Sequence, residues 1–141
     1  MYVTEDCLSH TRRECKYHVV FIPKYRKKMI LHELGKVPGE RFRKFAFQKE
    51  SQILEGHVMV DHVHMQVAIP PKYSVSQVVE YIKGRSAIWI ARNYFGGNQN
   101  IIRRHFWTCG YYVSTVGRDE KAIAEYIWNH EKRDIDEDWQ F

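Results

Sequence analysis

Two histidines separated by a single residue, His62 and His64 in the segment Asp61–Met65, are the residues that point most directly to chemistry. Alternate side chains of an extended strand lie on the same face of a sheet, so both imidazoles would be side by side. Neutral imidazole is a common metal ligand, and the pair therefore suits two ligands to one metal ion. Two histidines on a strand are also compatible with plain packing or solvation. Asp61 is either a hydrogen-bond acceptor that orients an imidazole or a turn residue.

A tyrosine and a third histidine, Tyr126 and His130, are four residues apart in a segment with helical periodicity. Residues with this spacing lie on one face of a helix, so a metal ion bound by His130 would have the tyrosine hydroxyl within one turn. A phenol with an ordinary pKa of ~10 needs help to attack a phosphate near neutral pH, and a Lewis-acidic metal ion supplies that help. The alternative is a tyrosine that packs in the core, as most of the nine tyrosines must.

The remaining sequence predicts the elements that would position these residues. Apolar and β-branched residues mark four strands, and apolar residues recur at helical spacing in three other segments. Their order predicts an α+β fold, the ferredoxin-like or RRM-like βαββαβ arrangement with a central antiparallel sheet and an extra C-terminal helix that carries Tyr126. We expect a single domain, residues 1–141, with a core from about 15 to 116. The expected strands are 15–23, 52–59, 62–69 and 106–116, and the expected helices are 38–50, 74–95 and 119–133.

The charge balance favours a polyanionic partner. Lysine and arginine number 22 against 17 acidic residues, and the formal net charge is +5. Basic and aromatic residues are interleaved in two segments at expected strand ends, a composition typical of surfaces that bind phosphates and stack unpaired bases. A further basic run, Arg41–Lys44, is interpreted mostly as the solvated face of a helix. The residues predicted to contact DNA are Lys24, Arg26, Lys27, Lys28, Arg103 and Arg104.

The cysteines and the hydropathy pattern indicate a cytoplasmic protein. Cys7, Cys15 and Cys109 are odd in number and lack the spacing of a zinc site, so neither a disulfide framework nor a cysteine-based metal site is expected. No segment approaches the ~20 apolar residues that a membrane-spanning helix requires. Residues 1–16 do not have the pattern of a signal peptide. We therefore expect neither secretion nor membrane insertion.

Six motifs, taken together, resemble one protein family. They extend through nearly the whole chain, and their combination is specific although each alone is weak. The motifs are residues 17–26 (YHVVFIPKYR), 61–65 (DHVHM), 70–76 (PPKYSVS), 81–84 (YIKG), 110–117 (GYYVSTVG) and 125–127 (EYI). On these residues the chain resembles the HUH single-tyrosine transposases, the TnpA proteins of small bacterial and archaeal insertion sequences that move as single-stranded DNA.

The resemblance implies a mechanism and an assembly. His62 and His64 would bind a divalent metal ion, Mg²⁺ or Mn²⁺, and Tyr126 would form a 5′-phosphotyrosine intermediate while freeing a 3′-OH. Cleavage and rejoining of single-stranded DNA would then need no nucleotide cofactor. The resemblance also implies a prokaryotic cytoplasm, recognition of DNA hairpins at the element ends, and a homodimer with composite active sites. In each site the histidines of one subunit would meet the tyrosine helix of the other, with Gly117 as the hinge.

Position 130 departs from the family pattern, which has glutamine there as the third metal ligand. His130 can replace it through a nitrogen donor, and the resulting set of His62, His64 and His130 favours softer metals than magnesium. A second class of function therefore stays open. It is a catalytically impaired or host-adapted protein of the same fold that binds single-stranded nucleic acid. Covalent attachment of DNA to the protein distinguishes the two classes.

Overall fold

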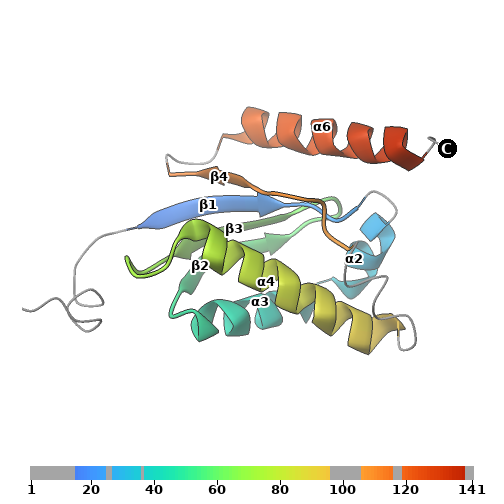
Figure 1. Ribbon diagram of the computed structural model, residues 1–141. Helices are drawn as coiled ribbons and strands as arrows, with labels where there is room; N and C mark the ends of the chain where they lie inside the picture. Colours follow the sequence, from blue (N-terminus) through green and yellow to red (C-terminus); the bar gives the residue numbers. More distant parts are fainter. Residues whose placement is uncertain (1–14, 25–26, 36, 96–105, 116–118, 139–141) are drawn as a thin grey trace, which may run out of the picture.

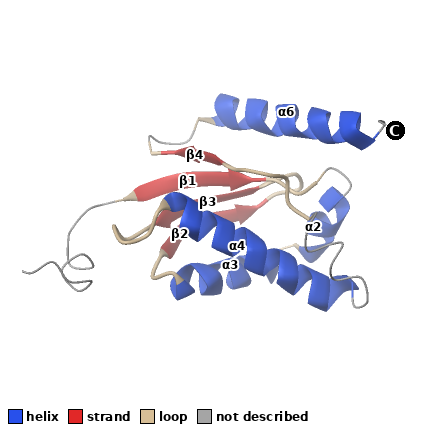
Figure 2. Ribbon diagram, viewed as in Figure 1, coloured by secondary structure: helices blue, strands red, loops and turns tan. Residues whose placement is uncertain are grey.

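Four strands form one antiparallel sheet with helices on both of its faces (Figures 1 and 2). The computed structural model describes residues 15–24, 27–35, 37–95, 106–115 and 119–138. The sheet order is β2-β3-β1-β4, which is the order of the split βαβ fold, and the expected fold class is confirmed. The elements in chain order are β1 (Lys16–Phe21), α2 (Lys28–Leu34), α3 (Val37–Gln48), β2 (Gln52–Val58), β3 (Val63–Ala68), α4 (Val75–Ile90), the π-helical turn η2 (Ala91–Phe95), β4 (Tyr112–Ser114) and α6 (Glu120–Asp138).

The two faces of the sheet are covered by different helices. Figure 1 shows α3 and α4 on one side of the sheet and α6 alone on the other. Val19 and Phe21 of β1 belong to the larger core, together with residues of α3 and α4, whereas Val20 belongs to a small cluster under α6. The central strand β1 is therefore buried on both faces, which explains why its apolar residues run together without alternation.

Apolar and polar side chains alternate along β3, and the apolar ones face the larger core as expected. Val63, Met65 and Val67 are buried in the larger core, so the intervening residues of β3 face α6. The helix α6 is attached to this face through two aliphatic side chains, Ile123 and Ile127, which contact Val20 and Ile22 of the small cluster. Burial of the two isoleucine side chains contributes about 3 to 6 kcal/mol, and Tyr126 packs against the same cluster.

The start of α4 is set by a capping box, as its sequence predicts. The hydroxyl of Ser74 accepts a hydrogen bond from the Gln77 backbone N–H at 3.1 Å, and the Gln77 side chain accepts one from the Ser74 N–H at 2.7 Å. The α-helix ends at Ile90 and continues as the π-helical turn to Phe95, where the expected helix also ends.

Three expectations about the elements were wrong. The strand expected over 106–116 is reduced to β4. Trp107 forms only an isolated bridge to Pro23 in the described residues, and Gly110 turns the chain with φ +83° before β4 begins. The helix α2 was not expected. The C-terminal helix extends beyond 133 to Asp138, since adding residues to an existing helix costs far less than nucleating one.

A buried lysine connects α4 to the segment that precedes β4. Lys83 is only 6% exposed, and its ammonium group donates hydrogen bonds to the carbonyls of Thr108 at 3.0 Å and Gly110 at 2.8 Å. Burial lowers the pKa of Lys83, because the charged form loses its hydration. The side chain thus replaces the ladder that the shortened strand does not form.

Replacement of Lys83 by methionine should destabilise the fold by about 2 kcal/mol, because two carbonyls would lose their donor while the side-chain volume stays similar. Urea unfolding followed by circular dichroism measures the change. The control is Arg85→Met on the exposed side of the same helix, for which we expect less than about 1 kcal/mol. Equal effects of the two substitutions would contradict the anchoring role of Lys83.

None of the helices in the described part of the chain is long and apolar enough to cross a membrane.

Candidate functional site

The two histidines of the Asp61–Met65 segment lie on the face of the sheet that α6 covers. His62 ends the tight turn between β2 and β3, where its carbonyl accepts a hydrogen bond from the Met59 N–H at 2.8 Å. His64 lies within β3 and is only 2% exposed. Both imidazoles lie on the side of the sheet that faces α6, but only His64 belongs to β3, because the strand expected over 62–69 begins at Val63.

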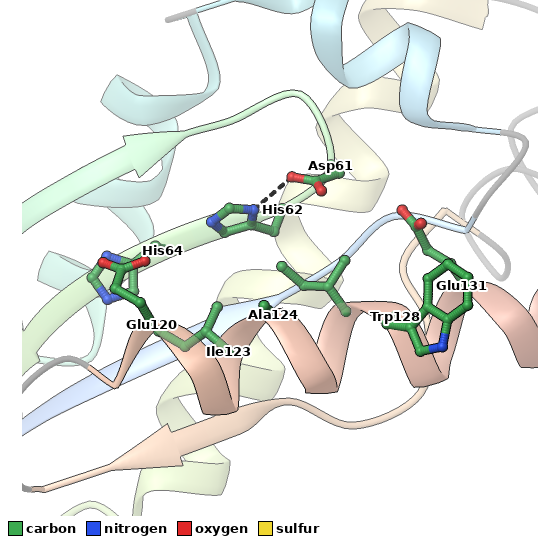
Figure 3. A pocket seen from close by; sticks show the side chains of 9 residues that line it. Asp61, His62, His64, Glu120, Ile123, Ala124, Trp128 and Glu131 are labelled. Atoms are coloured by element: carbon green, nitrogen blue, oxygen red, sulfur yellow. Dashed lines mark hydrogen bonds and ion pairs between the residues drawn. The ribbon is translucent and has the colours of Figure 1, made fainter.

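A carboxylate orients the first of these imidazoles. Nδ1 of His62 lies 2.7 Å from Oδ1 of Asp61 (Figure 3). Since an ionised carboxylate can only accept, the shared hydrogen belongs to Nδ1. In the neutral ring, Nε2 therefore keeps its lone pair. A carboxylate that accepts from one ring nitrogen of a histidine fixes which nitrogen is available to a metal ion, so Asp61 is more than a turn residue.

The second imidazole lies between two others. The ring of His64 stacks on that of His18 of β1, with centroids 5.5 Å apart and planes 12° from parallel, and on that of His57 of β2 at 6.3 Å and 11°. His57 is directly opposite His64 in the β2–β3 register. The sequence analysis did not single out His18 or His57, because their proximity depends on strand pairing rather than on spacing within one segment.

Both histidines line a cavity of about 350 Å³ between β3 and α6. Figure 3 places Glu120 toward the His64 end of this cavity, and Trp128 and Glu131 toward the other end. The sequence analysis missed these three residues of α6. Their spacing was the available signal, because positions 120, 124, 128 and 131 follow one face of a helix. The lining residues are Asp61, His62, His64, Glu120, Ile123, Ala124, Ile127, Trp128 and Glu131.

Tyr126 and His130 lie together on a different flank of α6. Their rings are 4.2 Å apart, and the Tyr126 ring also lies 5.9 Å from that of Tyr112 in β4. Nδ1 of His130 lies 3.1 Å from the carbonyl oxygen of Tyr126, which can only accept, so Nε2 of the neutral His130 ring keeps its lone pair. Neither residue lines the cavity that holds His62 and His64.

The tyrosine hydroxyl is buried. Among the described residues it has no hydrogen-bond partner. Burial raises the pKa of Tyr126 to about 12, despite the opposing charge of Arg133. The phenol is therefore neutral near pH 7 and poorly placed to act as a nucleophile while α6 keeps this position.

The structure thus assembles the predicted residues into two pairs and does not unite the pairs within one chain. In the described ranges, no group of three or more His, Cys, Asp or Glu side chains is placed to hold a metal ion. The set His62, His64 and His130 stays a prediction. The donors at one end of the cavity suit a divalent cation in chemical type, because His62 presents an oriented nitrogen and the carboxylate of Glu120 lies toward His64, whereas Glu131 at the other end is paired with Lys28.

Of the six residues predicted to contact DNA, three belong to the described part of the chain. Lys28 forms an ion pair with Glu131 of α6 at 2.7 Å, so it lies at one end of the histidine cavity. Lys24 and Lys27 are half-buried near the start of α2. Arg26, Arg103 and Arg104 lie outside the described residues.

The opposite face of the molecule carries basic residues stacked on aromatic rings. Lys49 lies 4.6 Å from the ring centroid of Tyr81, and Arg41 lies 5.5 Å from that of Trp89. Arg43 of the same basic run donates a hydrogen bond to the carbonyl of Ile53 at 2.8 Å. The run Arg41–Lys44 is therefore partly engaged by the fold rather than only solvated.

Comparisons with known proteins identify the family. Residues 11–130 match the family model described as "Transposase IS200 like". The chain is 40% identical over 134 residues to the transposase for insertion sequence element IS200 from Salmonella typhimurium, a match that covers 95% of this chain and 86% of the relative. It is 26% identical over 115 residues to the ISDra2 transposase TnpA of Deinococcus radiodurans, which covers 81% and 82% of the two chains. The chain therefore belongs to the IS200-like transposases, a family of DNA-cleaving enzymes.

Solved structures agree with this fold. A crystal structure from Deinococcus radiodurans R1, described as that of a transposase, superposes with a TM-score of 0.74 at 24% identity and covers 92% of this chain and 98% of that one. A REP-associated tyrosine transposase bound to a REP hairpin has a TM-score of 0.53 at 14% identity, covering 94% of this chain and 76% of that one.

Proposed function

We propose that this chain cleaves and rejoins single-stranded DNA at the ends of an insertion sequence, with a divalent metal ion and through a 5′-phosphotyrosine intermediate. The observation that carries the proposal is the cavity beside α6 in which Asp61 orients His62 next to His64. Membership of the family supports the same conclusion. DNA with hairpin ends is the proposed substrate, and the relative bound to a REP hairpin supports it.

The proposed chemistry is a pair of exchanges at one phosphorus atom. The Tyr126 oxygen attacks the scissile phosphate, and the bond to the 3′-oxygen of the preceding nucleotide breaks. The phenol loses its proton and the leaving oxygen gains one, so the products are a tyrosine-linked 5′-phosphate and a free 3′-OH. Attack by a 3′-OH on the phosphotyrosine rejoins a strand and restores the phenol. Bond energy is conserved at each exchange, and no nucleotide cofactor is consumed.

Four side chains of this chain would prepare the reaction. His62 and His64 would hold the metal ion, and Asp61 would keep His62 in the tautomer that presents Nε2. His130 would be the third ligand, because its own hydrogen bond to the Tyr126 carbonyl leaves Nε2 with its lone pair. When bound, a divalent ion polarises the phosphate as a Lewis acid.

The proposed site is composite. In the described arrangement the cavity histidines and the Tyr126–His130 pair lie on different flanks of α6, so one chain does not complete the site by itself. A tyrosine helix from a second subunit would bring the missing pair to the cavity. Such a docking would exchange the contacts that Ile123, Ile127 and Tyr126 make with the chain's own sheet for contacts with the partner subunit.

Incubation of the pure protein with single-stranded DNA and Mn²⁺ tests the proposal. We expect a fraction of the DNA to remain attached to the protein after denaturation, whereas duplex DNA should give no adduct. A protein that only binds nucleic acid would shift the mobility of the DNA under native conditions and leave no covalent product.

Substitution of His130 by glutamine should change the order in which metal ions support cleavage. Oxygen donors suit Mg²⁺, whereas imidazole favours Co²⁺, Ni²⁺ and Zn²⁺, so the variant should gain activity with Mg²⁺ relative to the softer ions. Adduct formation with each ion, compared between the two proteins, measures the shift. An identical order of metal ions in both proteins would exclude His130 as a ligand.

A further inference from the structure

A large aromatic side chain is exposed beside the histidine cavity. Trp128 of α6 is 66% exposed and lines the cavity together with Asp61, His62 and Glu131. Its neighbour Ile127 is buried against the sheet. A single exposed aromatic residue needs no explanation by itself, so the position of this indole within the candidate active site is the informative fact.

The charges around the indole suit a nucleic-acid strand. Glu131, which lies near Trp128 at the same end of the cavity, is paired with Lys28 at 2.7 Å (Figure 3). This ion pair offsets a negative charge that would otherwise repel a phosphate. The cavity lining next to Trp128 includes the apolar side chains of Ala124 and Ile127 and the paired Glu131, and the two histidines lie further along the cavity.

An unpaired nucleobase has the properties that fit this surface. A phosphate held at the cavity carries a nucleoside on each side, and in a single strand both faces of each base can be stacked. An indole offers a flat surface of matching size, and stacking on it does not depend on the identity of the base. Bases within a duplex are already stacked on their neighbours and would not be available.

We propose that Trp128 stacks on an unpaired nucleobase next to the scissile phosphate and so contributes to the preference for single strands. This inference rests on the proposed function, because it assumes that the cavity receives the scissile phosphate. It applies to the substrate-binding state in which α6 is docked as described and Trp128 lies beside His62, before α6 redocks for cleavage. Trp128 would then contact the substrate directly. This contact gives the exposed indole a role that the histidines and the tyrosine do not explain.

Binding of two synthetic strands tests the proposal independently of cleavage. One is oligothymidine, and the other is an abasic strand with the same number of phosphates and no bases. Trp128→Ala should weaken binding of oligothymidine about tenfold and leave binding of the abasic strand unchanged, and Trp128→Phe should keep most of the affinity for oligothymidine. Fluorescence anisotropy with Mn²⁺ present, in the Tyr126→Phe background to prevent turnover, measures each constant.

The control is Phe47→Ala, which removes an aromatic ring that is 79% exposed on α3, away from the cavity. It should change neither constant. Equal losses on both strands, no loss on oligothymidine, or a loss of oligomeric mass on sedimentation of Trp128→Ala would each overturn base stacking by Trp128. The proposed function fails on a different result, the absence of a covalent adduct from the unaltered protein, so the two failures are distinguishable.

Discussion

Tyr126→Phe should abolish the covalent protein–DNA adduct, with a loss of at least about 10³-fold in its rate, because the substitution removes the oxygen that is proposed to attack phosphorus in the cleavage step. Binding of single-stranded DNA should be unchanged, since only a hydroxyl group is removed. Denaturing electrophoresis with labelled DNA measures the adduct, and anisotropy measures binding. A comparable rate of adduct formation in the variant would contradict the assignment and direct attention to Tyr111 or to Tyr112, whose ring lies 5.9 Å from that of Tyr126.

The stability of the same variant provides a check on folding. The hydroxyl of Tyr126 is buried, and its pKa is raised to about 12, so the folded protein holds the phenolic proton more tightly than the unfolded chain does. The resulting stabilisation is present at neutral pH and is lost as the pH rises from ~10, the ordinary tyrosine value, through about 12. Tyr126→Phe should show a smaller loss of stability over this interval. It should unfold at a similar urea concentration at neutral pH.

Mixing His64→Ala chains with Tyr126→Phe chains should restore cleavage that neither variant has alone. In a composite dimer, the intact histidines of the Tyr126→Phe subunit meet the intact tyrosine helix of the His64→Ala subunit, so one of two sites is complete. If each chain used its own helix, every site in the mixed dimer would carry a lesion. Adduct formation after the two chains are unfolded and refolded together measures the outcome, and about half of the unaltered activity per mixed dimer is expected.

A chain that carries both substitutions is the matched control. When it is paired with the unaltered chain, each composite site contains one lesion and the mixed dimer should be inactive. A site built within one chain would instead leave the unaltered subunit fully active. Activity in this control, together with none in the mixture of single variants, would refute the composite site.

Much of the fold follows from local sequence patterns. The continuous apolar run of β1 and the alternation of apolar and polar residues in β3 predict two strands of the sheet. The capping box at Ser74 predicts the start of α4. The helix α2 was missed because its apolar residues Ile30, Leu31 and Leu34 occupy little more than one turn, which is too short for periodicity to be recognised. The extent of β4 depends on the turn that the chain makes at Gly110 with φ +83°, and local alternation does not reveal that turn.

The sequence predicted the two pairs of candidate residues, but it did not predict how the fold places the pairs relative to each other. Spacing within one segment places His62 beside His64 and Tyr126 beside His130. The rotation of α6 about its own axis decides which flank meets β3, and this rotation is set by the docking of Ile123 and Ile127 on the sheet. Because those contacts come from distant segments, the sequence indicated neither the carboxylates of α6 in the cavity nor the burial of the Tyr126 hydroxyl.

The His62–His64 pair and the Tyr126–His130 pair do not meet within one chain, and this separation affects how the rate of cleavage depends on the protein concentration. If a complete site requires two chains, then activity at low expression rises with the square of the protein concentration, and a few isolated copies are harmless to the DNA around them. The burial of the Tyr126 hydroxyl acts in the same direction, since in a lone chain the proposed nucleophile is out of contact with nucleic acid. With a composite site, cleavage would therefore depend more steeply on the protein concentration than it would with a site built within one chain.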